Sequence, residues 1–124
     1  MKNTYEELFD EFLAITEFLL LKHKDGTFSL EDRQYANFGN IEDDRFKTAS
    51  EVLDRMDVYI QDYLIVDIED ALDEESIEID CDWKEYGKYR DLIPDYRFDF
   101  DLLDMIVNHS NEVDLNNCDY SLAD

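Results

Sequence analysis

Carboxylates crowd the stretch from Glu51 to Asp82, where thirty-two residues hold thirteen acids and a single cation, Arg55. Groups of this kind can bind metal ions, exchange protons or attract a basic partner. Apolar residues such as Leu53, Met56 and Ile60 alternate with the acids, whereas disordered acidic runs lack residues to bury. A folded element therefore holds these charges at fixed spacing. The thirteen acids are Glu51, Asp54, Asp57, Asp62, Asp67, Glu69, Asp70, Asp73, Glu74, Glu75, Glu78, Asp80 and Asp82.

Catalytic motifs are scarce. Asp82-Trp83-Lys84 matches the short acid-x-Lys pattern of metal-dependent nucleases, but the accompanying Pro94-Asp95 pair follows this pattern instead of preceding it. Chance matches of this kind are expected in a chain with 34 acids. The sequence also lacks a glycine-rich phosphate loop and a nucleophile elbow. We therefore expect a protein without enzymatic activity.

Metal-binding motifs are incomplete as well. A calcium loop needs alternating oxygen ligands, a central glycine and a final glutamate. Asp25-x-Thr27-x-Ser29 lacks the glycine and the glutamate, and Asp99-x-Asp101 lacks the third ligand and the glycine. His23 and His109 have no metal-ligand spacing; we expect His23 to cap a helix and His109 to end one. No metal site and no cofactor is predicted.

Net charge and composition indicate the kind of partner. The chain carries a formal charge of -23, although 44% of its 124 residues are apolar. Small domains remain soluble at a magnitude of about 2 to 8, and further like charge destabilises the fold. This balance argues against nucleic acid or an acidic membrane as the ligand and favours a basic protein. Without a secretory signal, we expect a cytoplasmic setting in which Cys81 and Cys118 are free thiols, with a disulfide as the less favoured alternative.

Hydrophobic spacing in the first half predicts helices. Thr4 and Glu7 form a capping-box pattern that opens a helix, and Lys22 to Lys24 fall in its last turn before Asp25-Gly26. A short helix from Ser29 to Phe38 is predicted next. From Thr48, a helix to about residue 74 is expected, with a shift or break near residue 65. In an unbroken helix, Asp67 would point into the apolar face.

Alternation in the second half predicts strands. Ile77, Ile79, Cys81 and Trp83 alternate with polar residues, which indicates a strand over 77–84. Residues 96–101 alternate similarly and are expected to pair with it in a hairpin. A final helix carries Leu102 to Ile106, and 110–124 is predicted to be an irregular tail. The sequence thus predicts a single α+β domain over 1–124, mostly helical, with helices packed on a small antiparallel hairpin.

The charge spacing is comparable with that of DNA. A helix over 48–75 would be about 42 Å long and carries a net charge of -9, about one charge per 5 Å. One DNA strand carries a charge per about 3.4 Å of axis. Glu78, Asp80 and Asp82 on an adjacent strand would bring the density of the protein surface into that range.

In size, acidity and aromatic content, the whole chain resembles the small phage-encoded DNA-mimic inhibitors of the antirestriction and anti-CRISPR type. These families share no motif, so no residue role is carried over. The resemblance implies an inhibitor that occupies the DNA channel of a restriction-modification enzyme or a CRISPR effector, as a monomer or homodimer. The expected contact residues are the thirteen acids above, extended by Asp99 and Asp101. The alternative is an acidic immunity or antitoxin-type protein that binds a basic partner without mimicking DNA.

Overall fold

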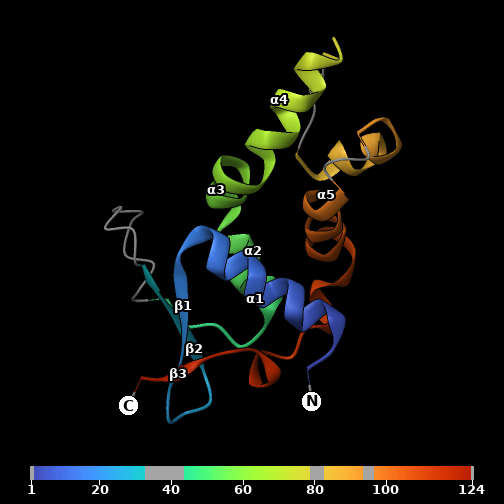
Figure 1. Cartoon of the computed structure of the whole chain (residues 1–124). Coiled ribbons are helices and arrows are strands. Elements are labelled where there is room, and N and C mark those ends of the chain that lie inside the picture. The colour runs from blue at the N-terminus through green and yellow to red at the C-terminus, as the bar shows by residue number, and fades with distance from the viewer. Residues whose placement is uncertain (1, 33–43, 79–82, 94–96, 124) are drawn as a thin grey trace.

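The computed structural model describes residues 2–32, 44–78, 83–93 and 97–123, with the side chains of 97–99 not described. The protein is α+β and mostly helical, as the sequence predicted, with a small three-stranded mixed sheet. Its main elements, in chain order, are α1 (Thr4–Thr16), β1 (Phe18–Lys22), β2 (Phe28–Asp32), α2 (Ala49–Arg55), α3 (Asp57–Tyr59), the π-helix η2 (Ile60–Ile65), α4 (Val66–Glu74), the 3-10 helix η3 (Trp83–Leu92), α5 (Arg97–Asp104) and the π-helix η5 (Met105–His109). In Figure 1, α3 and α4 rise away from α1 and the sheet, with α5 beside them.

Helix α1 begins one residue earlier than the pattern indicated. Asn3 is the N-cap, and its side chain accepts from the Glu6 amide while Glu6 accepts from the Asn3 amide. The helix ends at Glu17, whose left-handed conformation (φ 60°) breaks the helical backbone. The predicted continuation to Lys24 is therefore wrong.

An antiparallel hairpin forms, but its strands are not the predicted ones and lie in segments that were expected to be helical. β1 pairs antiparallel with β2, from Phe18 opposite Asp32 to Lys22 opposite Phe28. The turn between them includes Gly26 at φ +88°, a conformation that glycine adopts without strain. The predicted helix over 29–38 is wrong at its start, because 28–32 is a strand; 33–43 lies outside the described residues. β3 (Ser121–Leu122) runs parallel to β1 on its other side.

The long acidic helix forms as predicted, including its break. Thr48 caps α2 by accepting from the Glu51 amide. The helical path continues to Glu74, with an interruption at Met56 and a π-helical turn over 60–65. A π turn contains one residue more than an α turn, so it rotates the following residues around the axis. As a result Ile68 is buried and Asp67 is exposed.

The hairpin predicted for 77–84 and 96–101 is wrong where the structure describes it. Trp83–Leu92 is a 3-10 helix, and Arg97–Asp104 is the first part of the last long helix. Residues 79–82 and 94–96 lie outside the described residues. The 3-10 helix buries Trp83 and Tyr86, three positions apart, on one side. Gly87 lies against α5, where an added Cβ would stand 3.1 Å from Asp104 Oδ1.

The C-terminal segment contains short elements and packs against the body. Two short 3-10 turns cover Ser110–Glu112 and Leu115–Asn117. Val113, Leu115 and Cys118 are buried, and Cys118 is a free thiol. His109 is the last residue of η5, as predicted, and its ring stacks on Tyr5 at 4.3 Å between centroids.

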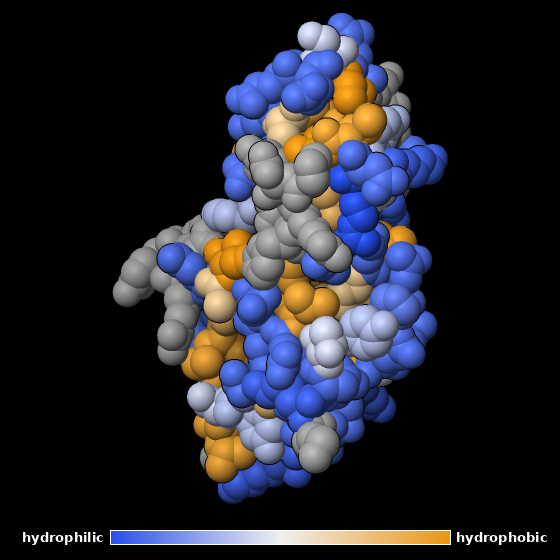
Figure 2. All heavy atoms as spheres, turned by 45° about the vertical axis from the view of Figure 1, so that its right-hand side comes forward, coloured by the Kyte–Doolittle hydropathy of each residue, from blue (hydrophilic) through white to orange (hydrophobic). Residues whose placement is uncertain are grey.

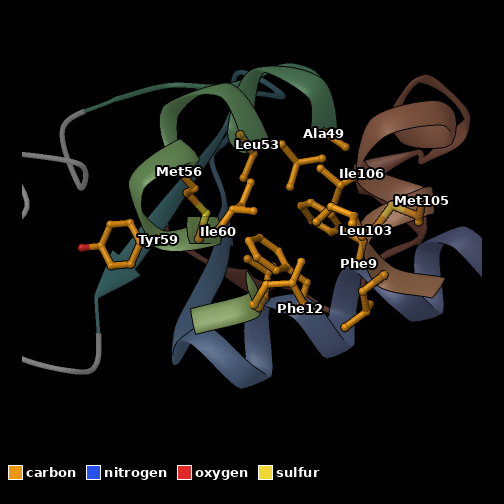
Figure 3. Close-up of a cluster of buried hydrophobic side chains, with 14 of the residues drawn as sticks. Phe9, Phe12, Ala49, Leu53, Met56, Tyr59, Ile60, Leu103, Met105 and Ile106 are labelled. Carbon is orange, nitrogen blue, oxygen red and sulfur yellow. The ribbon is translucent and has the colours of Figure 1, made fainter. Parts of the chain in front are cut away.

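The core joins the two halves of the chain. Figure 3 shows Phe9 and Phe12 of α1 pointing toward Leu53 and Ile60, with Leu103 beside them. All of these side chains are at most 5% exposed. Because α2 and α3 are anchored here, the acidic helix that continues from them has a fixed base.

Candidate functional site: an acidic interface

Eight of the predicted contact acids are exposed and have no side-chain hydrogen bond or ion pair within the described part of the chain. We call them the unpaired acids: Asp54, Asp62, Asp67, Asp70, Asp73, Glu74, Glu75 and Glu78. No Lys or Arg occurs in the sequence between Arg55 and Lys84. These charges are therefore directed to solvent without a cation from their own segment.

Helix α4 carries the densest group of unpaired acids. At 100° per residue, Asp67, Asp70, Asp73 and Glu74 lie within an arc of about 120°. The opposite side holds Ile68, Ala71 and Leu72, all buried. The π turn that precedes α4 produces this separation, because it moves Asp67 out of the apolar side.

Four other predicted acids have partners inside the molecule. Glu51 accepts from the Thr48 hydroxyl, and Asp57 Oδ1 accepts from Trp83 Nε1 at 2.9 Å. Glu69 Oε1 accepts from Gln61 Nε2 at 2.6 Å and from the Tyr86 hydroxyl at 2.8 Å. Asp101 pairs with Arg90. Asp57, Glu69 and Asp101 therefore connect different elements of the fold, and only Asp101 has a cation as its partner.

The remaining predicted acids are not placed. Asp80 and Asp82 lie outside the described residues, and the side chain of Asp99 is not described. The hairpin that was expected to bring Asp99 and Asp101 next to Glu78 does not form, since α5 covers 97–104.

Ion pairs in the described part of the chain join Lys2, Arg55, Lys88 and Arg90 to acids outside α4. Lys2 bridges Asp10 and Asp119 at 2.7 Å each, and this pairing raises the pKa of Lys2. Arg90 lies between Asp101 and Asp104, with its Nη1 2.7 Å from Asp104 Oδ2. Neither of these cations pairs with an acid of α4.

Apolar side chains accompany the acids on the outer side of the helix. Val58, Tyr63 and Val66 are 59%, 40% and 44% exposed. The position of Val66 depends on the π turn that precedes it, whereas Val58 lies before that turn. Figure 2 shows hydrophilic side chains around the projecting end of the molecule, with apolar side chains between them.

The described residues contain neither a metal-binding cluster nor a membrane-spanning helix. No three His, Cys, Asp or Glu side chains there could together hold a metal ion. No helix within the described ranges is long and apolar enough to cross a membrane. The acids are thus arranged along the helix and do not converge on a point.

Comparison with known proteins returns no match to a protein-family model, a curated protein or a solved structure.

Proposed function

We propose that this protein is a non-catalytic inhibitor that presents DNA-like charge to the basic DNA-binding channel of another protein. The observation that supports this most directly is the row of unpaired acids on α4, held on one side of a helix with no cation between Arg55 and Lys84. Helical neighbours three or four residues apart stand about 5–6 Å from each other, somewhat wider than the roughly 3.4 Å of axis per charge in a DNA strand.

The mechanism follows from charge and rigidity. An anionic surface accelerates encounter with a positive channel. In the channel, carboxylates accept charge-assisted hydrogen bonds from arginine and lysine side chains that otherwise bind phosphate. A fixed helix contributes because less conformational entropy is lost than with a disordered acidic tail. The target class we propose is a host defence nuclease or CRISPR effector in the cytoplasm of a phage-infected cell.

A second candidate is an acidic immunity or antitoxin-type protein. The exposed Val58, Tyr63 and Val66 favour this alternative, since apolar contacts suit a protein surface better than a channel built for phosphates. The two candidates differ in what DNA does to the complex. DNA should displace a mimic from its target and leave the second kind of complex intact.

The test uses affinity capture from a bacterial lysate, followed by elution with duplex DNA. We expect a DNA-binding protein to be retained and then released by the duplex. Neutralising four acids of α4 (D67N, D70N, D73N and E74Q) should abolish retention. A variant with the same charge change at exposed acids elsewhere (E7Q, E11Q, E31Q and D91N) should retain it. If duplex DNA and the protein bind the captured target together, DNA mimicry is refuted.

A further inference from the structure

A pocket of about 190 Å³ lies where α2 and α3 meet η3 and η5. Part of its lining is apolar, from Leu53, Ile60 and Ile106, each at most 6% exposed. Asp54 and Asp57 add two carboxylates to the lining. The volume is below the roughly 300 Å³ of typical small-molecule sites. A pocket of this size suits the end of one side chain.

Trp83 also lines this pocket and is held in a fixed orientation. Its indole Nε1 donates to Asp57 Oδ1 at 2.9 Å. Lys84 Nζ stands 5.7 Å from the centroid of the Trp83 ring, a cation–π distance. The protein's own cation therefore lies over this aromatic ring. Its position shows that a positive charge can lie against this ring in the pocket.

We infer that this pocket receives the guanidinium group of an arginine from the basic partner. The inference rests on the proposed function and names one anchoring contact within it. A guanidinium is planar, stacks on aromatic rings and donates paired hydrogen bonds to carboxylates. Asp54, with no hydrogen bond or ion pair to any described residue, supplies the acceptor. The apolar walls suit the methylene groups of arginine, whereas a hard divalent cation requires six or more oxygen ligands.

The pocket has a built-in reporter, because Trp83 is the only tryptophan of the chain. The probe is N-acetyl-arginine amide, and the readout is the Trp83 indole N–H signal in NMR spectra. We expect a saturable shift with a Kd of roughly 1–10 mM, the range of a weak single-side-chain contact. N-acetyl-citrulline amide has nearly the same shape without the charge, and it should bind at least about tenfold more weakly.

Matched variants separate the pocket from general attraction to an acidic protein. D54N should weaken arginine binding by at least about threefold, and D91N, with the same charge change on η3 outside the pocket, should not. Replacing Lys84 with glutamine should strengthen binding, since the ring no longer carries a cation. An unchanged Trp83 signal at about 50 mM probe, equal binding of citrulline, or equal effects of D54N and D91N would overturn the inference.

The outcomes for the pocket and for DNA mimicry are distinguishable. If the α4 variant loses its target while D54N leaves both the Trp83 shift and target affinity unchanged, the pocket inference fails and the proposed function stands. If arginine shifts Trp83 but DNA does not displace the target, the pocket binds arginine and DNA mimicry fails.

Discussion

Individual carboxylates in this protein differ in role: some accept hydrogen bonds within the fold, and others are exposed without a partner among the described residues. Glu6 is 1% exposed and has no ion pair among the described residues, yet its two oxygens are both used. Oε1 accepts from the Asn3 amide at 2.8 Å, and Oε2 accepts from the Asp114 amide at 2.7 Å. The buried carboxylate thus joins the start of α1 to the C-terminal segment. The exposed acids of α4 have no comparable bond.

Replacing Glu6 should therefore destabilise the fold. We expect E6A to lower the free energy of unfolding by about 1–3 kcal/mol, because two partly buried amide donors lose their acceptor. E6Q should cost less, since the side-chain oxygen of glutamine can still accept one bond. E7Q, at an exposed position in the same turn, should change stability by less than about 0.5 kcal/mol. Urea unfolding measures all three, and equal effects of E6A and E7Q would contradict the assignment.

The second prediction at this scale concerns Cys118. Burial, together with the nearby Asp10 and Glu6, raises the pKa of its thiol to about 12. Because the thiolate is the reactive form, alkylation by iodoacetamide at pH 8 should be at least about a hundredfold slower in the folded protein than in urea. The measurement uses a C81S background so that one thiol remains. Similar rates in both states would show that Cys118 is accessible.

At the scale of elements, the sequence predicted the helix patterns better than the strands. The spacing of Leu53, Met56 and Ile60 indicated the acidic helix. Asp67, which would point into the apolar face of an unbroken helix, indicated a change of helical phase, and the π turn produces that change. Leu19 and Leu20 fit a helical stripe equally well, because short apolar runs do not distinguish helix from strand. Their pairing with residues 30 and 31 makes this segment a strand, and a pairing across ten or more residues cannot be seen in the local pattern.

The missed 3-10 helix had a signal in the sequence. Trp83, Tyr86 and Tyr89 recur at every third residue, the period of a 3-10 helix, but the alternation that begins at Ile77 suggested a strand through Trp83. For the candidate site, the acidic composition could be predicted. Which acids remain unpaired could not, because Glu69 and Asp57 meet Tyr86 and Trp83 only through tertiary packing.

The π turn yields a prediction about deletions. Removing Asp62, an exposed residue of η2, should convert the turn to regular α-helix and leave Ile65, Ile68 and Leu72 in phase with Ile60. We expect the variant to fold with a loss of less than about 1 kcal/mol. Removing Asp54, an exposed aspartate of α2, should cost more than about 3 kcal/mol, because Met56 and Tyr59 would rotate out of the core. Urea unfolding of both variants measures the difference, and equal losses would refute the register argument.

For the molecule as a whole, repulsion among the negative charges lowers the stability of the fold. The core supports a chain with a net charge of -23, and the acids of α4 have no ion pair with a described cation. Repulsion within α4 is therefore uncompensated in the free protein. A cationic partner would relieve it, so the same feature that destabilises the monomer favours binding.

The effect of salt on stability should measure this repulsion, because salt screens the interaction between exposed charges. Asp70 has like-charged helical neighbours at Asp67, Asp73 and Glu74, and each such pair costs about 0.2–0.5 kcal/mol. The Debye length falls from about 30 Å at 0.01 M to about 8 Å at 0.15 M, which weakens repulsion between exposed charges. We expect the free energy of unfolding to rise by about 1 kcal/mol over that range of NaCl. The D67N, D70N, D73N and E74Q variant should show a smaller rise than the E7Q, E11Q, E31Q and D91N variant, although both remove four charges. Equal slopes in urea unfolding would mean that the acids of α4 repel one another no more than acids elsewhere on the surface.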